Sequence, residues 1–196
     1  MAYSLDSSKD SCYPGTTVLI NKLGLREQAD LDAAERVAVA VHTVEIETAP
    51  PSEPFTFAYY LDLHRQLFQD LYDWAGNLRT INLSKKGTVF YPAAELAELG
   101  EAKFRRLQEQ HEFRGLERSA FISAIADFYH ELNMLHPFRE GNGRTQRLFF
   151  TLLIRRAGYD IDFAMCDTDF LMIATIQAAH GVTTYLKAFF DESITP

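Results

Sequence analysis

The stretch from His136 to Arg147 constrains this chain more than any other part of its sequence. Two glycines flank Asn142 there, so the backbone can adopt positive φ at little cost. Apolar residues then recur at helical spacing, which predicts a helix that begins near Gly143 and ends at Gly158. A glycine-rich turn that leads into a helix N-terminus directs free N–H groups to one point, which favours the binding of an anion.

The charged side chains around this turn indicate what the anion is for. Arg144 and Arg147 lie on one face of the first helical turn, where positive charge opposes the helix dipole unless an anion is held. Glu140 precedes the turn and suits Mg²⁺ that is shared with phosphate oxygens. His136 is expected to titrate near neutrality and to take a proton from an attacking hydroxyl. With Phe138 as an apolar anchor, these residues predict a phosphoryl- or nucleotidyl-transfer site.

The same twelve residues resemble the Fic motif, H-x-F-x-[D/E]-G-N-G-R-x-x-R, and match it at every defined position. The chain therefore resembles the Fic (filamentation induced by cAMP) domain family, and in size it is similar to small stand-alone bacterial Fic toxins that have a separate antitoxin. The resemblance implies protein adenylylation (AMPylation), in which AMP passes from ATP to a hydroxyl side chain of a target protein and pyrophosphate is released. ATP is then the substrate and Mg²⁺ the cofactor.

The resemblance also implies a role for each motif residue. His136 is the general base, Glu140 positions the metal, and Phe138 anchors the loop. The implied phosphate-binding residues are Gly141, Asn142, Gly143, Arg144 and Arg147. Related Doc kinases have lysine at the position of Gly143 and transfer phosphate, so this glycine favours adenylylation. A Doc-like phosphotransferase and a nucleotide-binding regulatory module without turnover remain as alternatives, and the intact His136 and Glu140 argue against the second.

Hydrophobic periodicity predicts a mainly α fold in one domain over residues 1–196. On the first helix, Leu31, Val37 and Val41 are expected to face the core, and Glu35 to be solvated. Residues 1–55 form an N-terminal helical extension, residues 56–160 the catalytic core, and residues 161–196 the C-terminal helices. Within these units the expected helices cover about 30–48, 56–76, 92–113, 119–135, 143–157, 168–179 and a short segment from 183.

A β-hairpin flap is expected at residues 80–91, because apolar and polar residues alternate around the turn at Lys85–Gly87. An isolated hairpin is only marginally stable in water, so we expect it to pack against the helices. Its exposed edge could pair with an extended segment of another protein. A mere connector is the alternative. In Fic proteins the element at this place registers the target backbone. The implied target-docking residues are Ser84, Lys85, Lys86, Gly87, Thr88, Val89 and Phe90. His64, earlier in the chain, is expected to be a packed or hydrogen-bonded core histidine.

The composition of the chain limits the kinds of partner and the cellular location that we expect for it. A net charge of −8 argues against nonspecific nucleic-acid binding. Two cysteines are too few for a disulfide framework and are expected to be reduced thiols. Residues 1–6 show no signal peptide, and no apolar run approaches the ~18 residues of a membrane span. These features predict a cytoplasmic protein without a membrane partner.

The resemblance implies both a target and a mode of control. Stand-alone Fic toxins of this kind adenylylate the ATPase-bearing (B-type) subunits of DNA gyrase and topoisomerase IV. Many Fic proteins are silenced by a helix with the signature [S/T]-x-x-x-E-[G/N], whose glutamate pairs with the last motif arginine, here Arg147. The nearest match, Thr43–Thr48, departs at its last position. A separate small helical antitoxin is therefore expected, with weak self-inhibition through Glu47 as the alternative.

Overall fold

The structure is a computed structural model that describes residues 4–5 and 11–196 of the chain. Within this part the fold is mainly helical, as predicted. The expectation about a signal peptide in residues 1–6 lies largely outside the described residues. The helices are α1 (Gln28–Thr48), α2 (Phe57–Phe68), α3 (Leu96–Glu109), α4 (Arg118–Leu135), α5 (Asn142–Arg156), α6 (Thr168–Ala179) and α7 (Thr184–Ser193), with 3₁₀ turns at Ala93–Glu95 and His111–Phe113.

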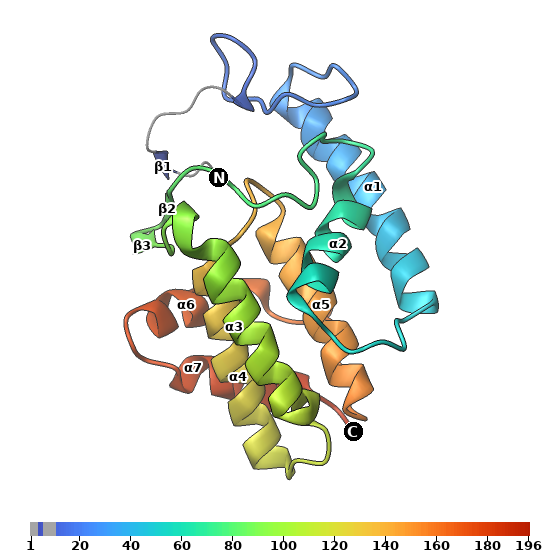
Figure 1. Ribbon diagram of the computed structural model, residues 1–196, viewed down its shortest axis with the longest axis vertical. Coiled ribbons are helices and arrows are strands. Elements are labelled where there is room, and N and C mark those ends of the chain that lie inside the picture. Colours follow the sequence, from blue (N-terminus) through green and yellow to red (C-terminus); the bar gives the residue numbers. More distant parts are fainter. Residues whose placement is uncertain (1–3, 6–10) are drawn as a thin grey trace.

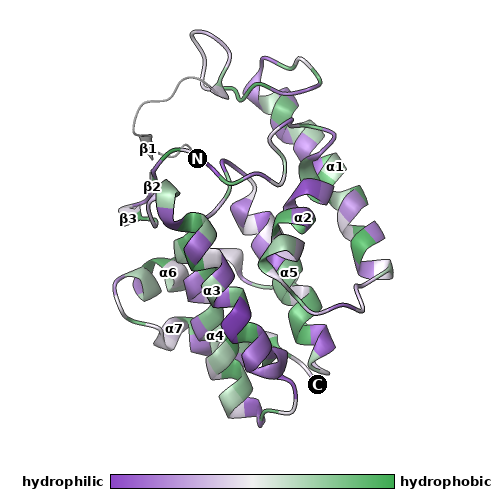
Figure 2. Cartoon of the chain, in the orientation of Figure 1, coloured by the Kyte–Doolittle hydropathy of each residue, from purple (hydrophilic) through white to green (hydrophobic). Residues whose placement is uncertain are grey.

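Helix α5 lies at the centre of the molecule, in contact with α1, α2 and α4 (Figure 1). Helix α3 packs on α2 and α4, while α6 and α7 pair with each other and cover α4. Hydrophobic and hydrophilic residues alternate along the helices, so that each can turn an apolar side inward (Figure 2). None of the helices in residues 4–5 and 11–196 combines the length and apolar character that a membrane span requires.

Helix α2 begins where the sequence predicts and ends earlier. The Thr56 side chain accepts a hydrogen bond of 3.0 Å from the Tyr59 N–H and caps the N-terminus. The helix ends at Phe68 and not near Gly76. The N–H of Gly76 donates to His64 Nδ1 at 2.9 Å, which requires the chain to turn back onto the helix it has just left.

Helix α1 spans nearly the predicted residues but buries a different face. Leu31, Glu35 and Ile46 are its buried residues, whereas Val37 and Val41 are exposed. The expectation that Glu35 is solvated is therefore wrong, as is the expected burial of the two valines. The reason is a buried polar contact: Glu35 pairs with an arginine of α5 and a tyrosine that follows α2, and apolar periodicity does not encode such a pairing.

The predicted hairpin is present as β2 (Leu83–Lys85) and β3 (Thr88–Val89). Positive φ at both Lys86 (49°) and Gly87 (82°) identifies the two-residue turn as type I′, which matches the twist of an antiparallel pair. A third strand, β1 (Ser4–Leu5), pairs antiparallel with the outer edge of β2 and was not predicted. The outer edges of the described sheet are therefore those of β1 and β3.

Candidate active site

The catalytic loop, defined here as residues 136–141, joins α4 to α5 and is closed by a buried asparagine. Asn142 is 2% exposed, and its Oδ1 accepts the Phe138 N–H at 2.9 Å. Its Nδ2 donates to the Phe138 carbonyl at 2.7 Å. The Phe138 ring is fully buried and stacks on His64 with 3.8 Å between ring centroids. Two hydrogen bonds and one aromatic anchor thus set the shape of the loop.

His64 is the packed, hydrogen-bonded core histidine that the sequence predicts. Its Nδ1 accepts from the Gly76 N–H, so the ring proton lies on Nε2, which donates to the Glu140 carbonyl at 3.0 Å. Burial lowers the pKa of His64 to about 3 and keeps the ring neutral. His64 thus connects the turn after α2 to the catalytic loop and holds that loop in place.

His136 ends α4 in the left-handed region, with φ of 42°, and is 7% exposed. Its ring stacks on Phe90 of the hairpin at a centroid distance of 3.8 Å, and its Nδ1 lies 3.3 Å from the Asn133 carbonyl. This contact places the ring proton on Nδ1 and makes Nε2 the proton-accepting nitrogen. Burial, with the nearby Lys85 charge as second cause, lowers the pKa of His136 to about 3. The expectation that it titrates near neutrality is wrong because the ring is desolvated.

The turn that starts α5 requires glycine at its first position. Gly141 has φ of 80°, and a Cβ there would lie 2.5 Å from ring carbons of Phe68. The first N–H groups of a helix have no partner within it, so those of Asn142 and Gly143 are available to an anion. The Glu140 carboxylate lies beside them, where its Oε1 accepts the Gly141 N–H at 2.9 Å.

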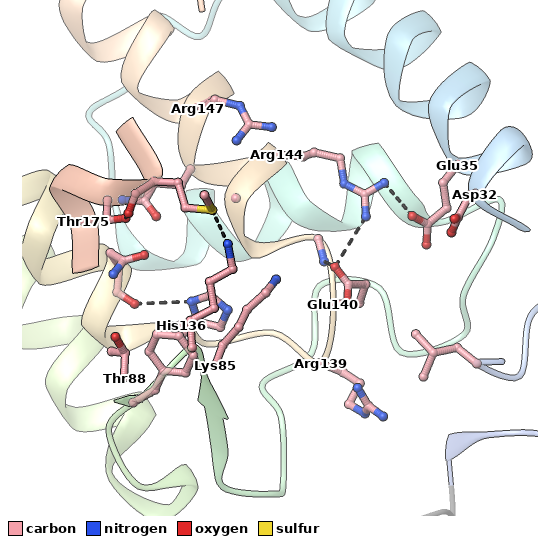
Figure 3. Close-up of a pocket in the computed structure, with 18 of the residues that line it drawn as sticks. Asp32, Glu35, Lys85, Thr88, His136, Arg139, Glu140, Arg144, Arg147 and Thr175 are labelled. Atoms are coloured by element: carbon pink, nitrogen blue, oxygen red, sulfur yellow. Dashed lines mark hydrogen bonds and ion pairs between the residues drawn. The ribbon is translucent and has the colours of Figure 1, made fainter. Parts of the chain in front are cut away.

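The two motif arginines have different surroundings. Arg144 donates from Nη1 to Glu35 Oε2 at 2.6 Å, and its Nη2 lies 3.6 Å from Glu140 Oε1 (Figure 3). Arg147 lines the same cleft one helical turn further on (Figure 3). Glu47, the alternative inhibitory residue, pairs with Arg155 at 2.6 Å, so the structure does not bring it to Arg147.

These groups surround a cleft of about 1020 Å³, which is ample for a nucleotide. The hairpin, the catalytic loop, α1, α5 and α6 all contribute to its walls. Within the described part of the chain, no group of three or more His, Cys, Asp or Glu side chains is placed to hold a metal. Glu140 alone nevertheless fits Mg²⁺, which is often held by one carboxylate together with substrate phosphates.

The flap residues divide into two groups. Val89 is 72% exposed, whereas Phe90 is 6% exposed, stacks on His136 and lines the cleft. Lys85, Lys86 and Thr88 line the cleft. Lys86 Nζ also donates to Met172 Sδ of α6, so the flap tip reaches across the cleft.

Arg79 is a site residue that sequence reasoning missed. It is buried, and its guanidinium donates to the carbonyls of His136 at 2.8 Å, Ile81 at 2.6 Å and Tyr91 at 2.5 Å. Its own N–H donates to the Pro137 carbonyl at 2.8 Å. One side chain thus joins the catalytic loop to both ends of the flap. Its position three residues after Gly76 carries no sequence signal for this role.

The helical fold and the catalytic loop are those of a known protein family. The model of the Fic/DOC family matches residues 54–154, so this chain belongs to that family. A relative from Sinorhizobium fredii, "Probable protein adenylyltransferase y4lH", is 37% identical over 90% of this chain and 91% of its own length. "Probable protein adenylyltransferase Fic" of Escherichia coli is 33% identical over 93% and 90%. Among solved structures, BepC from Bartonella tribocorum with bound AMPPNP superimposes with a TM-score of 0.89 at 27% identity, over 95% of this chain and 97% of that one.

Replacing Arg79 by lysine should destabilise the protein. A lysine ammonium cannot reach three carbonyls on separate segments, and each buried carbonyl left without a donor costs about 1–3 kcal/mol. We expect the free energy of unfolding in urea to fall by about 2 kcal/mol or more. Arg65→Lys is the control, because Arg65 makes an exposed ion pair with Asp62 that is worth at most about 1 kcal/mol. Equal losses for the two variants would contradict the role given to Arg79.

Proposed function

We propose that this chain is a protein adenylyltransferase that moves AMP from ATP to a hydroxyl side chain of a target protein. The observation that carries the proposal is the placement of a neutral histidine, a glycine turn at a helix N-terminus and two arginines around one cleft. The names of the similar proteins from Escherichia coli and Sinorhizobium fredii support the same activity.

In the proposed reaction, His136 Nε2 accepts the proton of the target hydroxyl. The hydroxyl oxygen forms a bond to the α-phosphorus of ATP, and the bond from that phosphorus to the bridging oxygen breaks. Pyrophosphate leaves, and AMP remains on the target. The N–H groups of Asn142 and Gly143 stabilise the negative charge on the reacting phosphate, as an oxyanion hole does. Arg144 and Arg147 bind the outer phosphates and hold the leaving group.

A histidine with a pKa of about 3 is a weak base, and the substrate itself corrects this. Phosphate charge beside the ring favours the imidazolium and raises the pKa of His136 when ATP is bound. The base then strengthens only in the loaded enzyme, closer to the range in which general-base catalysis is efficient. Glu140 would hold Mg²⁺ against the phosphates, where the ion supplies charge neutralisation.

The whole chain is proposed to act as one catalytic unit, residues 1–196, including the extension at 1–55 and the C-terminal helices at 161–196. The cleft supports this organisation, because Glu35 of the extension, His136 of the core and Thr175 of the C-terminal part all line it. ATP as substrate is in keeping with a cytoplasmic location.

Gly143 supports adenylyl transfer over phosphoryl transfer. A Cβ at this exposed position would lie 3.4 Å from Arg147 Nη1. A lysine there, as in Doc kinases, would bring a second cation beside the arginine proposed to bind the outer phosphates. The glycine keeps that path clear for a triphosphate.

The target is proposed to add a strand to the flap. Of the two outer edges of the sheet, that of β3 belongs to the strand whose Thr88 lines the cleft, and main-chain hydrogen bonds along such an edge register an extended segment. By resemblance to stand-alone Fic toxins, we propose the B-type subunits of gyrase and topoisomerase IV as targets and a separate helical antitoxin as inhibitor, facing Arg147. Incubation of purified gyrase B with the protein and labelled ATP tests the target.

The activity itself is tested with ATP labelled at either end. We expect protein to acquire label from α-³²P-ATP and none from γ-³²P-ATP, because the α-phosphorus is the one attacked. His136→Ala should lower that transfer by about 10²–10⁴-fold, the usual loss when a general base is removed, while calorimetry shows ATP affinity close to that of the wild type.

Label from γ-³²P-ATP would identify a phosphotransferase, and ATP binding without either label would identify a binding module. Near-normal transfer by His136→Ala would contradict the role of the base.

The flap proposal is tested at Val89. Val89→Asp places a charge on the exposed edge strand and should lower target labelling by about tenfold, as loss of an interface contact does. ATP affinity should not change, because Val89 is exposed and does not line the cleft. Val44→Asp is the control, since Val44 is also exposed but lies on α1. A matching loss of ATP affinity in Val89→Asp would contradict the docking role.

A further inference from the structure

We propose that Glu35 is a positioning residue that holds Arg144 ready for the phosphates of ATP. This inference rests on the proposed function and extends it to a helix outside the family match, because that match covers residues 54–154 and α1 precedes it. Neither the motif nor any sequence pattern assigns Glu35 a part in the reaction.

The contacts of Glu35 are those of a prearranged group. The residue is 7% exposed, and both carboxylate oxygens are engaged: Oε2 by Arg144 and Oε1 by the hydroxyl of Tyr72. Even for a paired and hydrogen-bonded carboxylate, the desolvation penalty can exceed the attraction, so Glu35 is held here at a cost in stability. Such a cost is expected where a charge is needed to orient another group.

The geometry favours orientation over blockade of Arg144. Only Nη1 donates to Glu35, at 2.6 Å, so the pair is not the two-pronged arginine–carboxylate fork that would occupy a whole edge of the guanidinium. The plane of Arg144 is held on its other side by the ring of Phe68, 4.8 Å from the guanidinium carbon. Arg144 Nη2 lies 3.6 Å from Glu140 Oε1, an ion pair that is too long for a hydrogen bond (Figure 3). Glu35 and Phe68 thus hold the guanidinium beside the carboxylate proposed to bind Mg²⁺ and leave Nη2 able to donate to a phosphate.

The same two helices provide an internal comparison. Glu47 of α1 pairs with Arg155 of α5 at 2.6 Å, the same distance as Glu35 to Arg144. The Glu47 pair lies at the other end of α1, away from the residues that line the cleft. Both pairs join α1 to α5, but only the Glu35 pair contacts a residue proposed to bind phosphate.

The test compares Glu35→Gln with Glu47→Gln. Glutamine keeps the size of the side chain and can still accept from Tyr72, but it removes the charge that orders Arg144. We expect the KM for ATP to rise about tenfold in Glu35→Gln, as expected when a substrate-positioning group is loosened, with kcat nearly unchanged. Glu47→Gln should leave both constants at their wild-type values. An unchanged KM in Glu35→Gln overturns the proposal, and a lower KM would show that Glu35 competes with phosphate instead.

A double substitution separates positioning from general loosening of α1. If Glu35 acts through Arg144, Glu35→Gln should have no further effect on KM once Arg144→Ala is present. An additional tenfold loss in the double variant would show that the effect does not pass through Arg144. Tyr72→Phe, which keeps the carboxylate but frees one oxygen, should raise KM in the same direction by a smaller factor, and no rise at all would count against the proposal.

Calorimetric titration with ATP runs alongside the kinetics. If the wild type transfers no AMP, the proposed function fails, yet the Kd for ATP still tests Glu35 by the same expected tenfold weakening relative to Glu47→Gln. An unchanged Kd in that case overturns the positioning role independently of the reaction.

Discussion

Asn142 donates to and accepts from the backbone of Phe138, and this pair of buried hydrogen bonds sets the geometry on which the site depends. Because the asparagine is both the first residue of α5 and the clasp of the preceding loop, the loop and the helix N-terminus have one fixed relation. Gly141 can then lie against Phe68 while the Glu140 carbonyl reaches His64. An anion-binding turn placed in this way requires little rearrangement when a phosphate arrives.

The remainder of the chain supports this loop from three sides. Arg79 joins it to the flap, His64 joins it to the turn after α2, and Glu35 connects Arg144, in the first turn of α5, to α1. In each case a buried polar side chain spans segments far apart in the sequence. A buried polar group that is fully paired restricts the arrangements open to its neighbours, so these residues add definition to the site as well as cohesion.

Much of the site could be predicted from the sequence, and the limits have physical causes. The motif brought His136, Glu140 and Arg144 together because they are close in the chain and their spacing encodes a loop and a helix start. The contribution of Glu35 could not be seen, since apolar periodicity assigns a charged residue to the solvent side and does not register a partner 109 residues away. For the same reason, Val37 and Val41 were predicted to lie on the buried face of α1, whereas both are exposed.

The hairpin shows the same division between local and long-range information. Its turn at Lys86 and Gly87 is a local feature and was predicted. The pairing of β1 with β2 and the stacking of Phe90 on His136 depend on how distant segments meet. That stacking also explains why the pKa of His136 is not the near-neutral value that the sequence predicted. The desolvation that lowers the pKa comes from tertiary packing.

The proposed mechanism requires a His136 ring that is buried and neutral in the free protein, and NMR can observe this directly. The Cε1–H resonance of His136, assigned by its absence in His136→Ala, should keep one chemical shift from pH 8 to about pH 5, because the pKa is lowered to about 3. With a non-hydrolysable ATP analogue bound, the midpoint should move upward. A titration centred near pH 6.5 in the free protein, the value of a solvated histidine, would contradict this mechanism.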